Sequence, residues 1–210
     1  TNISGVDTKL DTCITPEDPD PEPQADMHGL RFDSDRSTYL NRTPGVEGNR
    51  KTWTWSGWVK RSELGTIQRI FSGGAGGGNN DNYTSLLFRE DNTIWIGGAT
   101  SFFRDSIATF TDTSSWIHIV FTADLSNAND DSKFKVWVNG LNLDWTSTNS
   151  NPSATGINSA AIHTIGTEKD GSNNPCGLYL SECYFVDGQA LPPTVFGYDY
   201  ENQGKWAPLD

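Results

Sequence analysis

Asp33 and Asp35 are the acidic residues whose spacing comes closest to a catalytic pair in this chain of 210 residues. Retaining glycoside hydrolysis needs two carboxyl groups about 5–5.5 Å apart, which on a β-strand means two residues that share a face. The two aspartates, however, stand between Arg31 and Arg36 near the end of a short predicted strand. Turn capping and surface ion pairing explain them better than acid–base chemistry. Glu182 stands alone in its predicted strand, so the sequence shows no paired carboxylates.

Other catalytic and phosphate-binding patterns are also missing. The sequence contains no Gly-x-Ser-x-Gly elbow, and His28, His118 and His163 have no nucleophile close by in sequence. The glycine-rich run 73–78 suggests a phosphate-binding loop, but Asn-Asn-Asp follows at 79–81, where such a loop needs Lys and then Ser or Thr. We therefore predict a flexible loop there and no enzymatic activity.

The stretch from Trp116 to Trp145 indicates how the chain folds, because it reads as three consecutive β-strands. A polar loop separates the apolar run 116–124 from the run 134–138, which leads directly into Asn139-Gly140. Asn-Gly between two such runs is a strong hairpin signal, since both central residues of a type I′ turn need a positive φ. The sequence therefore predicts an antiparallel all-β domain.

Further strands are expected on both sides of this stretch. Along Trp53–Lys60 the residues alternate so that Trp53, Trp55, Gly57 and Val59 share the face that we expect to enter the core. No amphipathic helix of useful length is present, and residues 192–196 form one helical turn at most. The other predicted strands are 30–32, 37–40, 68–72, 85–89, 93–96, 162–166 and 178–186, with a hairpin turn at 90–92.

Composition and charge limit the class of protein. Eight Trp, ten Phe and six Tyr supply a large core, because each buried Trp removes about 150–250 Å² from water. At this length we expect one β-sandwich with an appendage. The net charge of −12 argues against duplex DNA and an anionic membrane as main partners. The sequence shows neither an apolar run approaching the roughly 20 residues of a membrane span nor a secretory signal.

The cysteines do not form a disulfide framework. Cys176 and Cys183 are seven residues apart in what reads as one strand, which separates their Cα atoms by roughly 23 Å, beyond the reach of a disulfide. We expect free thiols, which suit assembly in a reducing cytosol. Cys13 remains able to pair with either one.

The first segment differs from the rest of the chain. Residues 16–23 alternate proline with carboxylates, which favours an extended conformation and excludes a helix interior or a central strand. Residues 1–26 hold seven carboxylates against Lys9, so half of the net charge lies here. Composition alone fits a solvated tail. The alternative, which we favour, is an arm that lies on a basic surface of a partner.

The order of the predicted elements resembles the concanavalin A-like, laminin G-like jelly-roll superfamily. The resemblance covers nearly all of 30–186 and implies an antiparallel sandwich of two sheets, a fold that lectins, glucanases, adhesion modules and virion parts share. It rests on Trp53-Thr-Trp-Ser-Gly-Trp-Val-Lys60, Trp116-x-His118-x-Val120, Val136-Trp-Val-Asn-Gly140, Ile165-Gly166 and Tyr179-x-Ser-Glu182.

Several stretches resemble a version of this domain found in structural proteins of marine tailed bacteriophages. That resemblance implies a component of a capsid or tail, displayed outward on the particle. The stretches are Tyr39-Leu-Asn-Arg-Thr-Pro44, Gly48-Asn-Arg-Lys-Thr-Trp53, Phe185-Val-Asp-Gly-Gln-Ala-Leu-Pro192, Phe196-Gly197 and Gly204-Lys-Trp-Ala-Pro208.

The same resemblance implies that calcium is a candidate ligand, because some laminin G-like and pentraxin-like relatives bind it in loops at the rim of the sandwich. Asp124, Asn129 and Asp131, with Asn127 and Asp130, supply hard oxygen ligands here. The Gly and terminal Glu of an EF-hand are absent, and polar turn residues explain the cluster better. We predict no cofactor, with these residues as the candidates if calcium binds, and we interpret His118 as a satisfied, half-buried residue.

Sugar binding is the main alternative to a purely structural role. Trp95, Phe102, Phe103 and Trp145 lie close to predicted turns, where aromatic rings can stack on the faces of sugars. An exposed Trp145 would forgo several kcal/mol of burial and would need a functional reason. Packing in the core explains these rings better.

We therefore expect a non-enzymatic virion surface protein, present in multiple copies, with capsid or tail subunits as partners and assembly in the cytoplasm of a host bacterium. The alternative is a tail-fibre adhesin that binds host-surface glycans, with or without calcium. The predicted parts are an acidic arm at 1–29, a sandwich at 30–190 and a C-terminal extension at 191–210 that packs on the sandwich.

Overall fold

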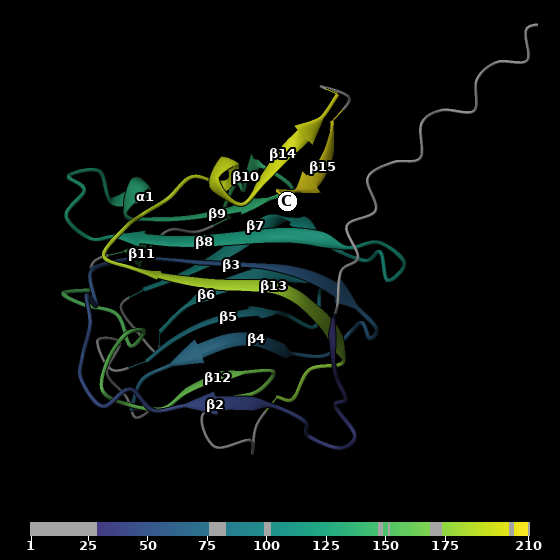
Figure 1. Ribbon diagram of the computed structural model, residues 1–210, viewed down its shortest axis with the longest axis horizontal. Helices are drawn as coiled ribbons and strands as arrows, with labels where there is room; N and C mark the ends of the chain where they lie inside the picture. The colour runs from purple at the N-terminus through teal and green to yellow at the C-terminus, as the bar shows by residue number, and fades with distance from the viewer. Residues whose placement is uncertain are drawn as a thin grey trace, which may run out of the picture.

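In the computed structural model the chain forms two antiparallel β-sheets packed face to face, with a small hairpin added near the C-terminus (Figure 1). The structure describes residues 29–75, 83–98, 102–146, 149–150, 152–168, 174–201 and 204–209. Within these residues every strand pairing is antiparallel, which confirms the all-β sandwich expected from the sequence. The predictions for the arm, for Cys13 and for most of the glycine-rich loop concern residues outside the described ranges.

One sheet has six strands in the order β1-β13-β3-β8-β9-β10, and the other has seven in the order β11-β7-β6-β5-β4-β12-β2. The strands of the six-stranded sheet are β1 (Leu30–Phe32), β3 (Thr52–Arg61), β8 (Ile117–Asp124), β9 (Phe134–Val138), β10 (Leu141–Asn142) and β13 (Leu178–Asp187). Those of the seven-stranded sheet are β2 (Leu40–Arg42), β4 (Gln68–Gly73), β5 (Thr84–Phe88), β6 (Thr93–Gly97), β7 (Phe102–Thr109), β11 (Asn149–Ser150) and β12 (His163–Ile165).

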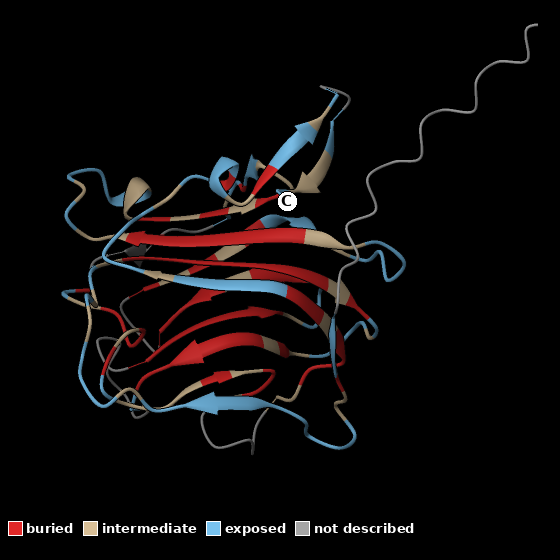
Figure 2. Ribbon diagram, viewed as in Figure 1, coloured by how far each residue is buried: buried red, intermediate tan, exposed pale blue. Residues whose placement is uncertain are grey.

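Strand β3 follows the predicted alternation. Trp53, Trp55 and Val59 are at most 2 % exposed and belong to the core between the sheets. The opposite face, with Thr54, Ser56 and Trp58, is also buried, because residues that follow β13 pack over it. Figure 2 shows this burial along the central strands of both sheets.

The hairpin predicted at Asn139-Gly140 joins β9 to β10, with φ angles of 48° and 78° at the two turn residues. Two things exclude a side chain at position 140. The positive φ disfavours any residue other than Gly, and a Cβ there would lie only 2.4 Å from the ring of Trp206. The expected third strand is short, however. Only Leu141 and Asn142, which form β10, pair with β9. Trp145 instead forms an isolated bridge to Ser106 in the other sheet.

The structure differs from the sequence predictions in several local details. The strand expected at 37–40 lies at 40–42, because Asp33 caps a turn through its Oδ1 and Ser37 takes a φ of 49°. Strands β7 and β11 were not predicted. The loop 125–132 contains the start of a one-turn helix, α1 (Asp130–Lys133).

The C-terminal residues fold back onto the six-stranded sheet. After β13 come a 3-10 turn, η2 (Pro193–Val195), and the strands β14 (Gly197–Tyr200) and β15 (Lys205–Pro208), which pair with each other. The turn lies within the single turn expected at 192–196. Cys176, just before β13, and Cys183, within it, are free thiols.

Candidate functional site

The outer face of the seven-stranded sheet brings together two of the aromatic residues that the sequence suggested. Trp95 on β6 and Phe103 on β7 lie on neighbouring strands and alternate with core residues, so both point away from the core. Both are half-buried. Gly97 pairs with Phe103 and has no room for a Cβ, because the Trp95 ring lies close over it.

Two ion pairs lie on the same face as these rings. Asp105 pairs directly with Trp95 across the strands, and its Oδ1 is 2.8 Å from the Nε of Arg89. Arg69 Nη2 is 3.1 Å from Glu168 Oε2. Desolvation raises the pKa of Asp105 above its ordinary value even though Arg89 acts in the opposite direction. Burial of this carboxylate thus outweighs the effect of the arginine on its pKa.

Phe102 and Trp145 lie elsewhere. Phe102 is 1 % exposed and stacks on Phe134 in the core, with ring centroids 3.7 Å apart, so no ligand can reach it. Trp145 packs against the core and lines a mainly polar cavity of about 450 Å³ at the rim. The guanidinium of Arg104 lies over its ring at 5.9 Å.

The calcium candidates do not converge on one point. Asp124 accepts hydrogen bonds from Ser126, and Asn129 caps α1 by accepting from the backbone of Asp131. Asp130 pairs with Lys133. These contacts are those of turn and cap residues. Among the described residues no three acidic, histidine or cysteine side chains group as metal ligands.

Arg104 holds this rim loop from inside. It is 1 % exposed, and its guanidinium donates to the backbone carbonyls of Asp130, Asp131 and Phe134 at 2.8–3.0 Å. A buried side-chain cation thus satisfies carbonyl oxygens of the kind that a rim calcium would take. Sequence reasoning missed Arg104, because a charged residue that points into a core breaks the hydrophobic alternation of its strand.

His118 lies on the outer face of the six-stranded sheet and is 1 % exposed. The indole N–H of Trp206 donates to its Nδ1 at 2.9 Å, so the neutral ring carries its proton on Nε2, 2.8 Å from Ser56 Oγ. Trp58 stacks on the ring at 5.0 Å. Desolvation lowers the pKa of His118 to about 4. This histidine is a fully bonded scaffold residue, more deeply buried than the sequence suggested.

A third feature is a cavity of about 550 Å³ on the side of the sandwich, between β13 of one sheet and β2 and β12 of the other. Its walls are mainly apolar, and they include Phe71, Phe185 and Ile165. Polar groups stand at its rim, among them Arg42, Glu47 and Asp187. The full lining is Leu40, Asn41, Arg42, Pro44, Val46, Glu47, Gly48, Phe71, Asn158, His163, Thr164, Ile165, Phe185 and Asp187.

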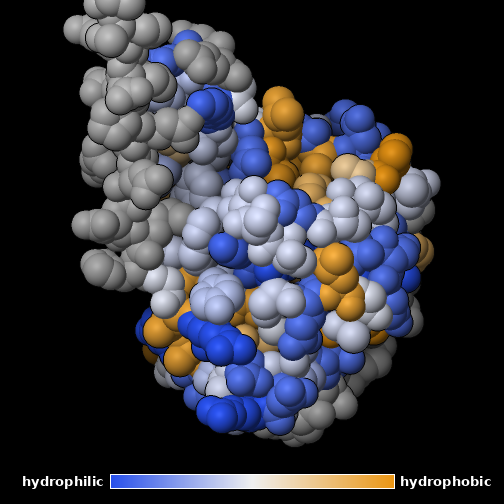
Figure 3. All heavy atoms as spheres, turned by 90° about the vertical axis from the view of Figure 1, so that its right-hand side faces the viewer, coloured by the Kyte–Doolittle hydropathy of each residue, from blue (hydrophilic) through white to orange (hydrophobic). Residues whose placement is uncertain are grey.

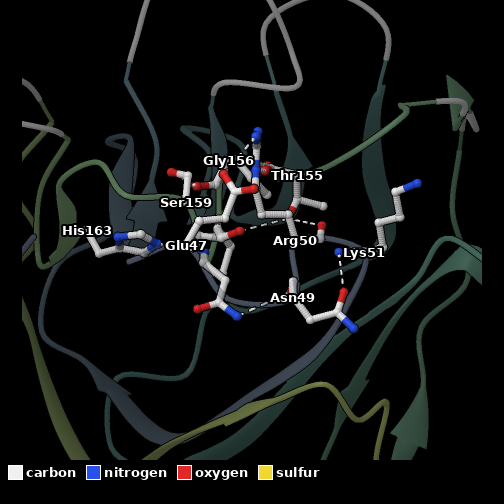
Figure 4. Close-up of polar contacts among 11 residues, drawn as sticks. Glu47, Asn49, Arg50, Lys51, Thr155, Gly156, Ser159 and His163 are labelled. Carbon is white, nitrogen blue, oxygen red and sulfur yellow. Dashed lines mark hydrogen bonds and ion pairs between the residues drawn. The ribbon is translucent and has the colours of Figure 1, made fainter. Parts of the chain in front are cut away.

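Two loops fix the end of this cavity. Arg50 donates to the carbonyl of Thr155 and pairs with Glu47, as Figure 4 shows. His163 accepts from the backbone N–H of Asn158 at 2.8 Å and donates to the Ala161 carbonyl, and desolvation lowers its pKa. Since His163 is neutral and bonded on both nitrogens, it has a structural role here rather than that of an acid or base.

Asp33 and Asp35, whose spacing comes closest to a catalytic pair in the sequence, lie in a turn. Asp33 accepts from the backbone N–H groups of Asp35 and Arg36, which makes the pair part of a turn.

No helix in the described part of the chain is long and apolar enough to cross a membrane. The end of the sandwich seen in Figure 3 is mostly hydrophilic, with separate hydrophobic side chains rather than one broad apolar patch.

Comparison with known proteins supports the fold. A family model described as "Concanavalin A-like lectin/glucanases superfamily" matches residues 34–191. No curated protein matches the sequence.

The solved structures that resemble this chain are distant in sequence. A heptameric SAP-like pentraxin from Limulus polyphemus is 16 % identical over 70 % of this chain and 68 % of its own, with a TM-score of 0.50. Domain 4 of AbnA, an extracellular arabinanase from Geobacillus stearothermophilus solved with arabinotriose, is 21 % identical over 71 % and 66 %, also at 0.50. A Trypanosoma rangeli sialidase is 15 % identical over 69 % of this chain and only 22 % of its own, again at 0.50. Such similarity shows the fold alone.

Proposed function

Because this chain belongs to the concanavalin A-like lectin/glucanases superfamily, we propose that it is a non-enzymatic surface protein of a bacteriophage particle, attached to capsid or tail subunits through residues 1–29. The superfamily name covers both binding and hydrolysis. The turn role of Asp33 and Asp35 supports the first of these.

One observation carries the assignment to a virion. Of the five stretches that resemble phage structural proteins, 39–44, 48–53 and 185–192 lie together around the side cavity, although they are far apart in sequence. The other two, 196–197 and 204–208, belong to the C-terminal hairpin on the six-stranded sheet. Leu40, Arg42 and Pro44 come from the stretch 39–44, and Phe185 and Asp187 from the stretch 185–192. A surface formed by three of these stretches supports a shared role for that surface.

Particles assembled with the truncated protein would test the attachment. We expect deletion of residues 1–29 to remove most copies from purified particles, because the arm carries half of the net charge of the chain. A matched variant keeps the length of the arm but replaces its seven carboxylates with amides, which separates charge from length. Unchanged occupancy of the deleted protein, measured by quantitative mass spectrometry, would contradict attachment through the arm.

A second candidate function is the recognition of glycans by the outer face of the seven-stranded sheet. Trp95 and Phe103 favour it, because rings held half-buried beside the Arg89–Asp105 ion pair offer both a stacking surface and hydrogen-bonding groups to a sugar. A glycan array, with and without calcium, tests this directly. Binding should be lost in Trp95→Ala and kept in Trp137→Ala, which removes a half-buried indole from the other sheet.

A further inference from the structure

Strand β13 has one edge that the described residues leave largely unpaired. On one side β13 pairs with β3 as far as Asp187. On the other side β1 pairs only with Leu178–Leu180, and no described strand pairs with Tyr184–Asp187. A bulge, at which Glu182 takes a φ of 47°, separates the two halves. The second half therefore presents a sheet edge of the kind that accepts a further strand.

This edge borders the side cavity. Across the cavity lies β2, itself an edge strand that pairs only with β12 among the described strands. Figure 2 shows β2 and most of the second half of β13 exposed, in contrast to the buried strands beside them. The apolar side chains at the rim are unusually exposed: Val46 is 82 % exposed, Leu40 48 % and Phe185 41 %. A groove of about 550 Å³ thus combines a free backbone edge with apolar walls.

We propose that this groove binds an extended segment of another protein, which adds as a strand to the free edge of β13. Backbone hydrogen bonds to Tyr184–Asp187 give such a segment its alignment. Because successive side chains of a strand point to opposite faces, every second residue of the segment enters the cavity. The walls formed by Phe71, Ile165 and Phe185 require these residues to be apolar.

The charges around the groove identify the kind of segment. Among the described residues, the cavity wall has two carboxylates, Glu47 and Asp187, and one guanidinium, Arg42, and Glu182 adds a carboxylate at the bulge beside the free edge. Arg50, outside the wall, pairs with Glu47. The chain as a whole carries −12. A second copy of the chain, or its own acidic arm, is therefore repelled, whereas a segment that alternates basic with apolar residues is attracted. The occupant is thus a basic, extended segment of a different protein.

A designed peptide tests the proposal on the full-length protein. The probe is the acetylated and amidated heptapeptide Lys-Val-Lys-Phe-Lys-Val-Lys, used as a titrant in NMR and hydrogen-exchange measurements. We expect slowed exchange of the amides at 184–187 and binding that weakens with added salt. Two control peptides accompany it. One has Pro in place of both Val residues and the Phe, and the other has Glu in place of every Lys. Both should fail to bind.

A pair of protein variants locates the site. Val46→Lys places a positive charge at the rim of the groove and should weaken binding by about tenfold. Leu141→Lys makes the same change at a residue that is 74 % exposed on β10, away from the groove, and should leave affinity unchanged.

Three results would overturn the proposal. The first is equal binding of the proline peptide, which would mean charge attraction without strand addition. The second is slow exchange at 184–187 in the protein without peptide, which would mean that the chain fills its own groove. The third is a dimer that Val46→Lys disrupts, which would make a second copy the occupant.

Discussion

The two outer faces of the sandwich differ in how their aromatic residues are treated. On the six-stranded sheet the C-terminal segment covers Trp58 and His118, which are at most 5 % exposed. On the seven-stranded sheet Trp95 and Phe103 stay half-buried beside ion pairs. The covered face has the contacts of a core, whereas the other has the contacts expected of a binding surface. Aromatic content alone therefore does not locate a site; the covering of each face does.

The largest expected effect concerns the covered face. Trp206→Ala should lower the free energy of unfolding by about 3 kcal/mol, because the ring fills the space over Gly140 and its N–H satisfies His118. Urea denaturation measures this. Trp206→Phe, which keeps most of the ring but not the N–H, should cost about 1 kcal/mol. Equal losses in the two variants would mean that the hydrogen bond outweighs the packing.

The second largest effect is expected from acid, which should lower the free energy of unfolding through His118 on the covered face. The pKa of His118 is about 4 in the folded protein and about 6.5 when unfolded, so the unfolded chain binds more protons between these values. Above pH 6.5 the titration of His118 costs the folded protein no stability. As the pH drops towards 4 the free energy of unfolding falls, by about 2 kcal/mol at pH 5. Unfolding curves from pH 7 to 4 measure it. His118→Gln should flatten the dependence to the part that His163, whose pKa is also lowered, contributes.

The open face should respond less. Trp95→Ala should cost about 1 kcal/mol of stability, because its ring is half-buried and, unlike that of Trp206, does not hydrogen-bond the buried His118. Thermal unfolding beside the Trp206→Ala variant gives the comparison. A loss as large as that of Trp206→Ala would show that Trp95 is a scaffold residue.

The smallest expected effect is at Asp105. Asp105→Asn should change the free energy of unfolding by less than about 0.5 kcal/mol, because the raised pKa indicates that burial of the carboxylate offsets its pairing with Arg89. Glycan binding, if this face has it, should nevertheless weaken. A clear loss of stability would show that the ion pair supports the fold instead.

Much of the fold could be predicted because its signals are local. The alternation along Trp53–Lys60 and the Asn139-Gly140 turn depend only on residues adjacent in sequence. Strand β7 was not predicted because Arg104 and Ser106 point inward, which removes the hydrophobic alternation that marks a strand. Strand β2 was misplaced because the capped turn after Asp33 extends to Thr38.

The candidate binding face could be predicted only in part. Trp95 and Phe103 stood out by residue type, but their common face follows from the register of β6 and β7. Arg69 and Glu168 come from segments about a hundred residues apart, so no local pattern joins them. The side groove could not be predicted from the sequence either, because an unpaired strand edge is a property of the assembled sheets.

The order β1-β13-β3 also has a consequence for how the chain is made. Leu30 pairs with Leu180, and Trp58 with Ser181, so the six-stranded sheet joins residues about 120–150 positions apart. During synthesis β8 and β9 can pair early, but β3 keeps an open edge until β13 leaves the ribosome. The tryptophans of β3 then stay exposed to solvent until β13 has been synthesised. We therefore expect truncation before residue 178 to yield aggregated rather than partly folded protein, and full-length yield to depend on chaperones.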